Sequence, residues 1–483
     1  MKNMIKYISV IVVAVLMCSC KGGFMDINKN PNYPETVTDP LMLLPSGQIQ
    51  VAAIVGGDME LVGSLWSQHY TQNNASNQYN TTVDYSITNT SYQRFWSIPY
   101  AGAIPDLTNA VKYSAAAGNA DNLFVASETM LCFMYHILGS WYGDIPYTEA
   151  ALGNANLTPK FDEGSAINDD LIKRLENVIS KATSAANAAV DMSGQDIVFG
   201  GSVKNWIAFA KTLRLKLMMR NWSKYSSTIA TALDAGGFLT TDAKIATFVN
   251  EENHSNPLFE NDRRKLNTTR NMVACNTLAN YLRANADPRI KVFYDKTSGA
   301  YPYPSNEAGY RLATGIRYSR ATLAATDPVY FMSEAESYFL QAEAWARLDK
   351  ASKAQSFYEA GVKAAFDRWG YDCSTFIATG GVYAFDATSQ ATMLKCILTQ
   401  KWVAATRCQA WDSFFDITRT GIPALGTKLT SEAGYVSGEL VPVVDSSLPA
   451  DQFPHRMLYP KSSSDYNTNT PTVKIEAKQW WQK

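Results

Sequence analysis

The sequence predicts a mostly α-helical protein in which pairs of helices stack into a scaffold that carries long irregular loops. Apolar residues recur at the spacing of an amphipathic helix in several segments between residues 121 and 366. One such segment, residues 328–370, contains two Ala-rich helices separated near Leu348 and Asp349. Two tyrosine-rich segments, 72–92 and 294–318, are much longer than ordinary connections. Helix pairs and long loops together predict a helical-repeat scaffold with functional loops.

The composition is that of a folded protein without affinity for nucleic acid. Hydrophobic residues make up 46% of the 483 residues and charged residues 18%, which excludes wholesale disorder. The net charge is −1 and no block of Lys and Arg stands out, so the basic surface that binds nucleic acid is not evident. Tyrosine is in excess, with 26 residues, and its apolar ring with a polar tip suits binding surfaces as well as cores.

The N-terminus has the pattern of an export signal. Lys2 and Lys6 precede an apolar run from Ile8 to Met17. This run is about half as long as the ~20 apolar residues that a spanning helix needs. We therefore expect residues 1–19 to be a removable signal peptide and not a permanent anchor.

The residues after the apolar run resemble a bacterial lipoprotein box. Ser19 directly precedes Cys20, and a flexible polar segment follows. Cys20 is the predicted lipidated residue, because bulky Met17 stands in the small-residue position before the other candidate, Cys18. The alternative is an ordinary secretory signal, although no A-x-A-like cleavage site is present. A multiply acylated cysteine would anchor the protein stably at a membrane.

The chain after the signal divides into a tether and one large domain. Residues 20–40 combine Gly, Asn and Pro without periodicity, which predicts a lipidated tether. Residues 41–483 are expected to form a single helical domain. Within it, the helix that begins after Ser202 carries Lys and Arg between its apolar residues. We interpret this basic face as solvated side chains or partners of core contacts, and not as a phosphate-binding stripe.

Two segments of the domain resemble tetratricopeptide helix pairs. Such repeats of about 34 residues must stack on one another to bury their apolar sides. The clearer pair is residues 328–370, where small residues let two helices approach closely, and the second is residues 202–237. No strict repeat period is visible, so a degenerate array is expected.

The two long loops form the predicted ligand-binding region. Asparagine amides match the vicinal hydroxyls of sugars, and tyrosine rings cover apolar sugar faces. We expect both loops to project from one side of the scaffold as a shallow platform of exposed aromatic rings with amides at its edge. The alternative is that they are only well-solvated surface loops. The candidate ligand-binding residues are Asn74, Asn77, Tyr79, Asn80, Tyr85, Tyr301, Tyr303 and Tyr310.

The sequence predicts no metal site and no cofactor. The cysteines beyond Cys20 are widely spread, odd in number and without C-x-x-C or paired histidine spacing, so a structural zinc site is not supported. Most are expected to be small buried hydrophobic residues. They are Cys132, Cys275, Cys373, Cys396 and Cys408.

Seven segments, in order along the chain, resemble the motifs of one family, the SusD/RagB-like outer-membrane lipoproteins. Residues 141–150 resemble its GDIPYTEA stretch, residues 159–162 its P-x-F-D, and residues 206–220 its W-x-x-F-A-x-x-L-R-L helix. Residues 335–346 resemble its AE…AEA helix, and residues 400–423 its late segment with QKW and R-x-G-x-P. Residues 454–460 resemble its P-x-R-x-x-Y-P signature, and Trp480 with Trp481 its terminal WW.

The resemblance implies a lipoprotein that faces the cell exterior and captures nutrient, commonly oligosaccharide. It also implies a SusC-like TonB-dependent outer-membrane transporter as partner, in a complex with two copies of each protein. A peptide or another nutrient is the alternative cargo. The motif residues are expected to do structural work, so none of them is a predicted ligand contact. The acidic tract that often follows the lipidated cysteine is weak, with Asp26 the only carboxylate among residues 21–28.

An enzyme and a purely scaffolding lipoprotein are the rival functions. The four histidines are far apart and never form H-E-x-x-H, and no G-x-S-x-G elbow or Gly-rich phosphate loop is present. His136 falls within an apolar helix, where a buried core histidine is the simpler interpretation. Two facing carboxylates of a glycosidase would leave no motif. The loop composition favours ligand capture over scaffolding alone.

Overall fold

Helix α7 (Asp121–Tyr142) lies at the centre of the computed structural model, which describes residues 39–266, 271–295, 305–309, 317–449 and 451–483. Both α7 and the segment Pro40–Trp66 are long and apolar enough to cross a membrane. The apolar stretch of α7 is 94% buried inside the fold, as a helix that is hydrophobic all round requires. The predicted signal peptide and nearly all of the tether, residues 1–38, lie outside the described residues.

Residues Leu41–Lys483 form one compact unit, and helices surround α7 within it. The predicted mostly helical fold is confirmed. The helices of the N-terminal half are η1 (Pro40–Met42), α2 (Leu43–Val55), α3 (Asp58–Trp66), α4 (Asn80–Val83), α5 (Arg94–Ile98), η2 (Pro99–Ala103), α6 (Ile104–Ala117), η3 (Gly153–Ala155), α8 (Gly164–Ser180) and α9 (Ala182–Ala186).

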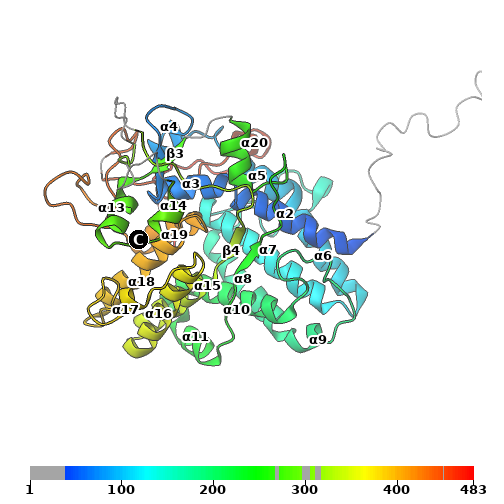
Figure 1. The fold of residues 1–483 in the computed structure, drawn as a ribbon. Helices are drawn as coiled ribbons and strands as arrows, with labels where there is room; N and C mark the ends of the chain where they lie inside the picture. Colours follow the sequence, from blue (N-terminus) through cyan, green and yellow to red (C-terminus); the bar gives the residue numbers. More distant parts are fainter. Residues whose placement is uncertain (1–38, 267–270, 296–304, 310–316, 450) are drawn as a thin grey trace, which may run out of the picture. The chain divides into compact units, whose positions relative to one another are not determined.

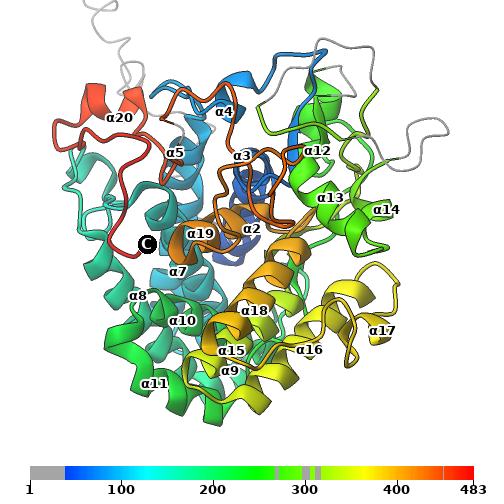
Figure 2. The same ribbon diagram turned by 90° about the vertical axis from the view of Figure 1, so that its left-hand side faces the viewer.

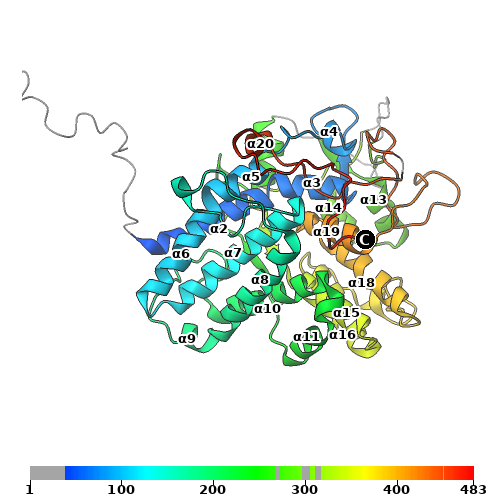
Figure 3. The same cartoon turned by 180° about the vertical axis from the view of Figure 1, so that it is seen from behind.

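The two predicted helix pairs are α10 (Val203–Arg220) with α11 (Trp222–Ala235), and α15 (Glu334–Arg347) with α16 (Ala351–Asp367). The first helix of each pair begins at a serine N-cap. The Ser202 hydroxyl accepts a hydrogen bond from the Asn205 N–H, and the Ser333 hydroxyl accepts one from the Glu336 N–H. A Cβ at Gly361 would meet the Phe339 ring at 2.8 Å, so α15 and α16 approach closely only because this residue is glycine. Figures 2 and 3 place both pairs at the end of the unit opposite α4 and α20 (Lys461–Tyr466).

The strands that the structure describes form two antiparallel pairs. β1 (Tyr70–Gln72) pairs with β3 (Met272–Ala274), and β2 (Ala243–Ile245) pairs with β4 (Val329–Met332). The remaining helices are α12 (Pro257–Phe259), η4 (Glu260–Lys265), α13 (Asn276–Ala284), α14 (Ile290–Phe293), α17 (Ser374–Ile377), α18 (Gln390–Ala404) and α19 (Ala410–Thr420).

Aromatic rings hold α19 against α3 and α7 in the core. The Trp141 ring stacks on Phe414 with centroids 5.1 Å apart and an angle of 14°. The edge of Trp66 meets Trp141 at 5.9 Å. Trp66 and Trp141 are fully buried, and large buried rings contribute strongly to core stability.

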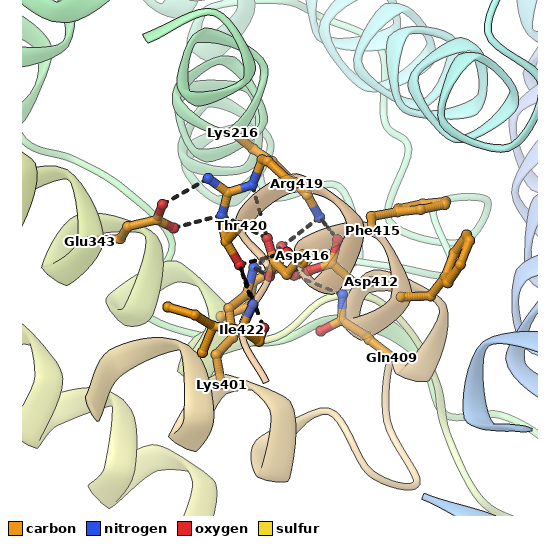
Figure 4. A network of polar contacts seen from close by, with 12 residues as sticks. Lys216, Glu343, Lys401, Gln409, Asp412, Phe415, Asp416, Arg419, Thr420 and Ile422 are labelled. Atoms are coloured by element: carbon orange, nitrogen blue, oxygen red, sulfur yellow. Dashed lines mark hydrogen bonds and ion pairs between the residues drawn. The ribbon is translucent and has the colours of Figure 1, made fainter. Parts of the chain in front are cut away.

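A network of largely buried charges joins α19 to both helix pairs (Figure 4). Arg419 donates two parallel hydrogen bonds of 2.7 Å to Glu343. Burial raises the pKa of Glu343, but the charges of Arg419 and Arg347 and the hydrogen bonds from Arg419 together outweigh burial and lower that pKa to about 2. Lys401 Nζ lies 2.6 Å from Asp416 and 2.9 Å from Asp412. The network comprises Lys216, Glu336, Glu343, Lys401, Asp412, Asp416 and Arg419.

Two motifs that are far apart in sequence also meet in space. The Tyr459 hydroxyl donates a 2.6 Å hydrogen bond to the Asp144 carbonyl oxygen, and Arg456 donates to the carbonyl oxygen of Tyr142. Gly143, between these acceptors, has φ +82°, a conformation that glycine adopts without strain. The turn at residues 142–145 and the segment at residues 456–459 therefore brace each other.

Candidate functional site

The two predicted ligand-binding loops meet at their bases. β1 leads directly into the loop of residues 72–92, which we call the Asn-rich loop, and pairs with β3. Val273 of β3 in turn forms a bridge with Arg320, just after the second loop. The Asn73 N–H donates a 2.7 Å hydrogen bond to Asn271 O, and the Tyr294 hydroxyl donates a 2.8 Å bond to His69 O. Figure 1 shows α4 and β3 at the same end of the unit. The described flanks of both loops thus form one region, which we call the loop face.

The buried side chain of Gln72 fixes the shape of the Asn-rich loop. Its amide nitrogen donates to the carbonyl oxygens of Asn73 and Asn271 at 3.1 and 3.2 Å, and also to the Ser76 hydroxyl. Its amide oxygen accepts a 2.6 Å bond from the Tyr79 N–H. One side chain therefore closes the turn of residues 72–79 and ties it to β3.

Tyr79 points into the protein and not towards solvent. Its side chain is buried, with 7% of the residue exposed, and its hydroxyl donates a 2.7 Å hydrogen bond to Asp262. Burial and the charge of Asp262 raise the pKa of Tyr79 far above its usual value. The expectation of an exposed ring at this position is wrong, because the buried Asp262 carboxylate draws the phenol inwards.

Tyr85 is buried as well, with 5% of the residue exposed. Its ring lies edge-on to Trp66 at 6.3 Å and to Phe453 at 5.8 Å. Its φ of +61° is uncommon for a residue with a side chain, and it turns the ring into the core. The expected exposure of Tyr85 is therefore also wrong. Ligand contact by Tyr79 or Tyr85 stays a prediction that their burial argues against.

The Asn-rich loop presents amides to solvent, beside exposed threonines such as Thr81 and Thr88. Asn77 and Gln78 are exposed, and Asn74 and Asn80 are half-buried. Asn80 begins helix α4. Sequence reasoning proposed Asn74, Asn77 and Asn80 and missed Gln78, because nothing in the sequence distinguishes this exposed amide from the buried amides of Gln72 and Asn73. The proposed Tyr301, Tyr303 and Tyr310 lie outside the described residues.

The buried histidines are core residues. His136 is 2% exposed, and burial lowers its pKa well below the usual range. Burial likewise lowers the pKa of His69 to about 3. Both rings are therefore neutral at physiological pH.

In the part of the chain that the structure describes, no three His, Cys, Asp or Glu side chains gather in an arrangement that could hold a metal ion. Its cysteines are free thiols; Cys132, Cys275, Cys373 and Cys408 are buried and Cys396 is half-buried.

A family described as SusD-like, starch-binding and associating with the outer membrane matches residues 31–460. The chain belongs to the SusD-like family. Members of this family are binding proteins and not enzymes. The protein is accordingly a non-catalytic protein associated with the outer membrane.

Solved structures share the fold at low sequence identity. A SusD homologue from Bacteroides uniformis is 21% identical with a TM-score of 0.75, covering 92% of this chain and 99% of its own. A chitin-binding SusD homologue from Flavobacterium johnsoniae is 19% identical with a TM-score of 0.75, covering 92% and 98%. A SusD/RagB family protein from Bacteroides thetaiotaomicron is 19% identical with a TM-score of 0.70, covering 92% and 99%. No curated protein matches the chain.

Proposed function

We propose that this SusD-like protein captures a neutral oligosaccharide at the cell surface and delivers it to a TonB-dependent outer-membrane transporter. The observation that carries the proposal is the loop face, where Asn77 and Gln78 present amides to solvent. The descriptions of the family as starch-binding and of a similar structure as chitin-binding support a saccharide as cargo. Both named saccharides are neutral or nearly neutral polymers, which suits the uncharged amides of the Asn-rich loop.

The chemistry of the Asn-rich loop fits sugars better than charged ligands. Asp84 is the only charged residue in 72–92, and it is half-buried. Amides offer a donor and an acceptor side by side, as vicinal hydroxyls require. We propose that Asn74, Asn77 and Asn80 supply these amides, together with Gln78. Tyr301, Tyr303 and Tyr310 of the second loop are proposed to supply the aromatic rings.

The cellular arrangement belongs to the same proposal. Acylation at Cys20 would hold the protein at the outer membrane, facing the cell exterior. The partner would be a SusC-like transporter, with two copies of each protein in the complex. Permanent complexes typically bury about 2,000 Å² or more, so the pair should survive mild detergent. A pull-down that recovers this protein without any transporter would contradict this part.

Calorimetry on loop variants tests the binding role. The double variant Asn77→Ala/Gln78→Ala should weaken binding of the best ligand among maltoheptaose, chitohexaose, cellohexaose and xylohexaose by about tenfold, which corresponds to 1.4 kcal/mol. Asn187→Ala is the matched control, because this exposed asparagine follows α9, at the opposite end of the unit from α4. Equal affinity of the double variant and the control would contradict the loop face as the binding site.

A further inference from the structure

A groove lies beside the loop face. This groove has a volume of about 520 Å³, within the range of small-ligand sites. It lies between α5 with η2 and the start of α6, the segment 146–159, and α20 with Asn467. Figures 1, 2 and 3 all place α5, α20 and α4 towards the same end of the unit. The lining of the groove includes Trp96, Tyr100, Glu149, Asn156, Leu157 and Tyr466.

Two aromatic rings held firmly in place line the groove. Trp96 and Tyr100 are half-buried, with ring centroids 4.6 Å apart. Trp96 also stacks on Phe161 at 5.9 Å, and the Tyr100 hydroxyl donates a 2.8 Å hydrogen bond to Pro146 O. Rings that are already fixed lose little freedom when a ligand arrives, so they are well suited to binding.

The walls of the groove are tied together across the sequence. Asn467 donates a 2.7 Å hydrogen bond to Pro159 O, and Asn469 donates a 3.0 Å bond to Thr158 O. These bonds fasten the segment after α20 to the segment 146–159. The Lys461 N–H also donates a 2.8 Å bond to Asn89 O, which connects α20 to the Asn-rich loop. The groove is therefore preformed and adjoins the loop face.

Exposed apolar side chains gather at the groove. Tyr466 is 82% exposed and Leu157 is 73% exposed, the two highest values among the large hydrophobic residues that the structure describes. Side chains of this kind lose contact with water when a ligand covers them, and such burial is favourable.

The polar side chains of the groove suit an uncharged ligand. Glu149 is the only acidic or basic residue among its described lining residues. One Glu149 carboxylate oxygen accepts a 2.8 Å hydrogen bond from the Asn156 amide and a 3.0 Å bond from the Lys160 N–H. Asn156, Asn109 and two serines add amides and hydroxyls to the lining. Aromatic rings beside amides and one carboxylate form the set of groups that binds sugars through stacking and hydrogen bonds.

We propose that this groove is a second binding site for a neutral saccharide, separate from the loop face. The inference rests on the proposed function, because it takes the cargo to be a neutral oligosaccharide. Tyr466 and Leu157 cover the apolar face of a sugar ring, Trp96 and Tyr100 line the groove beneath it, and Asn156 and Glu149 bind its hydroxyls.

Calorimetry with the same oligosaccharides separates the two sites. Tyr466→Ala/Leu157→Ser removes exposed side chains, so the melting temperature should not change. Wild type should bind two molecules of a short oligosaccharide. In this groove variant, one of the two molecules should no longer bind, or its affinity should fall at least tenfold. Tyr113→Ala is the matched control, because Tyr113 is a 42% exposed tyrosine on α6 that does not line the groove. The loop variant Asn77→Ala/Gln78→Ala should still bind one oligosaccharide in the groove.

The outcomes distinguish this inference from the proposed function. If the groove variant titrates like wild type while the loop variant loses binding, the groove inference is overturned and the proposed function stands. If wild type binds none of the saccharides, both are overturned. If the groove variant keeps full saccharide binding but no longer co-purifies with a transporter, the groove is a protein interface and the inference is wrong.

Discussion

The phenol of Tyr79 donates a 2.7 Å hydrogen bond to the Asp262 carboxylate, a residue 183 positions away in sequence. This bond fastens the Asn-rich loop to η4 and withdraws the ring from solvent. Removing the hydroxyl in Tyr79→Phe leaves a buried carboxylate with one donor fewer. We expect the free energy of unfolding to fall by about 1.5 to 3 kcal/mol, as for hydrogen bonds to charged groups, and urea denaturation measures it.

The matched control for this variant is Tyr113→Phe, because Tyr113 is 42% exposed and its phenol already contacts water. It should unfold like wild type, and both variants should bind oligosaccharide normally. A Tyr79→Phe protein of unchanged stability but weakened saccharide binding would show that Tyr79 contacts ligand after all.

Arg419→Ala tests the charge network that joins the helix pairs to α19. It removes the bidentate partner of the buried Glu343 carboxylate, which keeps its ion pair with Arg347 at 2.8 Å. Because Glu343 stays paired with Arg347, the loss of stability should be smaller than the about 3 to 5 kcal/mol of a buried charge left uncompensated, and thermal and urea unfolding would detect it. The exposed pair Lys363–Asp367 provides the comparison, since Lys363→Ala should change little. Equal effects of the two substitutions would contradict a stabilising role for the network.

Much of this architecture could be predicted from sequence, because helix signals are local. Apolar spacing and the N-cap residues Ser202 and Ser333 mark the two helix pairs within a few dozen residues. The burial of Tyr79 and Tyr85 could not be predicted in this way. It depends on Asp262 and on Phe453, which the fold brings to the loop from distant parts of the chain. An Asn- and Tyr-rich composition does not reveal which residues face inwards.

The groove was missed for the same reason. Its lining comes from residues 96–109, 146–159 and 462–467, and none of these segments has a binding motif of its own. Pro146 belongs to a motif, residues 141–150, that the sequence predicts to have a structural role. The structure adds that the carbonyl oxygen of Pro146 holds the Tyr100 ring in place.

Glu60→Gln should alter the pH dependence of stability. Burial raises the pKa of Glu60 from 4.5 to about 8, and a hydrogen bond from the Ala410 N–H opposes this only in part. Between these values the folded protein binds more protons than the unfolded chain, so stability falls as pH rises through this range. We expect Glu60→Gln to lose less stability than wild type between pH 5 and pH 9 in urea denaturation.

Glu252→Gln is the control for that measurement, because Glu252 is exposed. It should follow the wild-type pH profile. If Glu60→Gln loses as much stability as wild type across the range, the Glu60 carboxyl is not protonated in the folded state.

Cys20→Ser should release the protein from the membrane without unfolding it. Cys20, the proposed site of lipidation, precedes the compact unit Leu41–Lys483, so the helical domain should fold without a lipid. Fractionation of cells, followed by thermal unfolding of the released protein, checks both points. Cys18→Ser is the matched control and should remain membrane-bound. Retention of Cys20→Ser with the membranes would exclude Cys20 as the anchor.

The most direct test of the account is calorimetry of the soluble domain with neutral oligosaccharides at two salt concentrations. Stacking and neutral hydrogen bonds, each worth about 0.5 to 1.5 kcal/mol net, carry no salt dependence of the kind that ion pairs show. We predict weak binding of at least one of maltoheptaose, chitohexaose, cellohexaose and xylohexaose, with the same affinity at 50 mM and about 500 mM salt. No binding of any of them, or binding of a peptide in their place, would contradict the central claim.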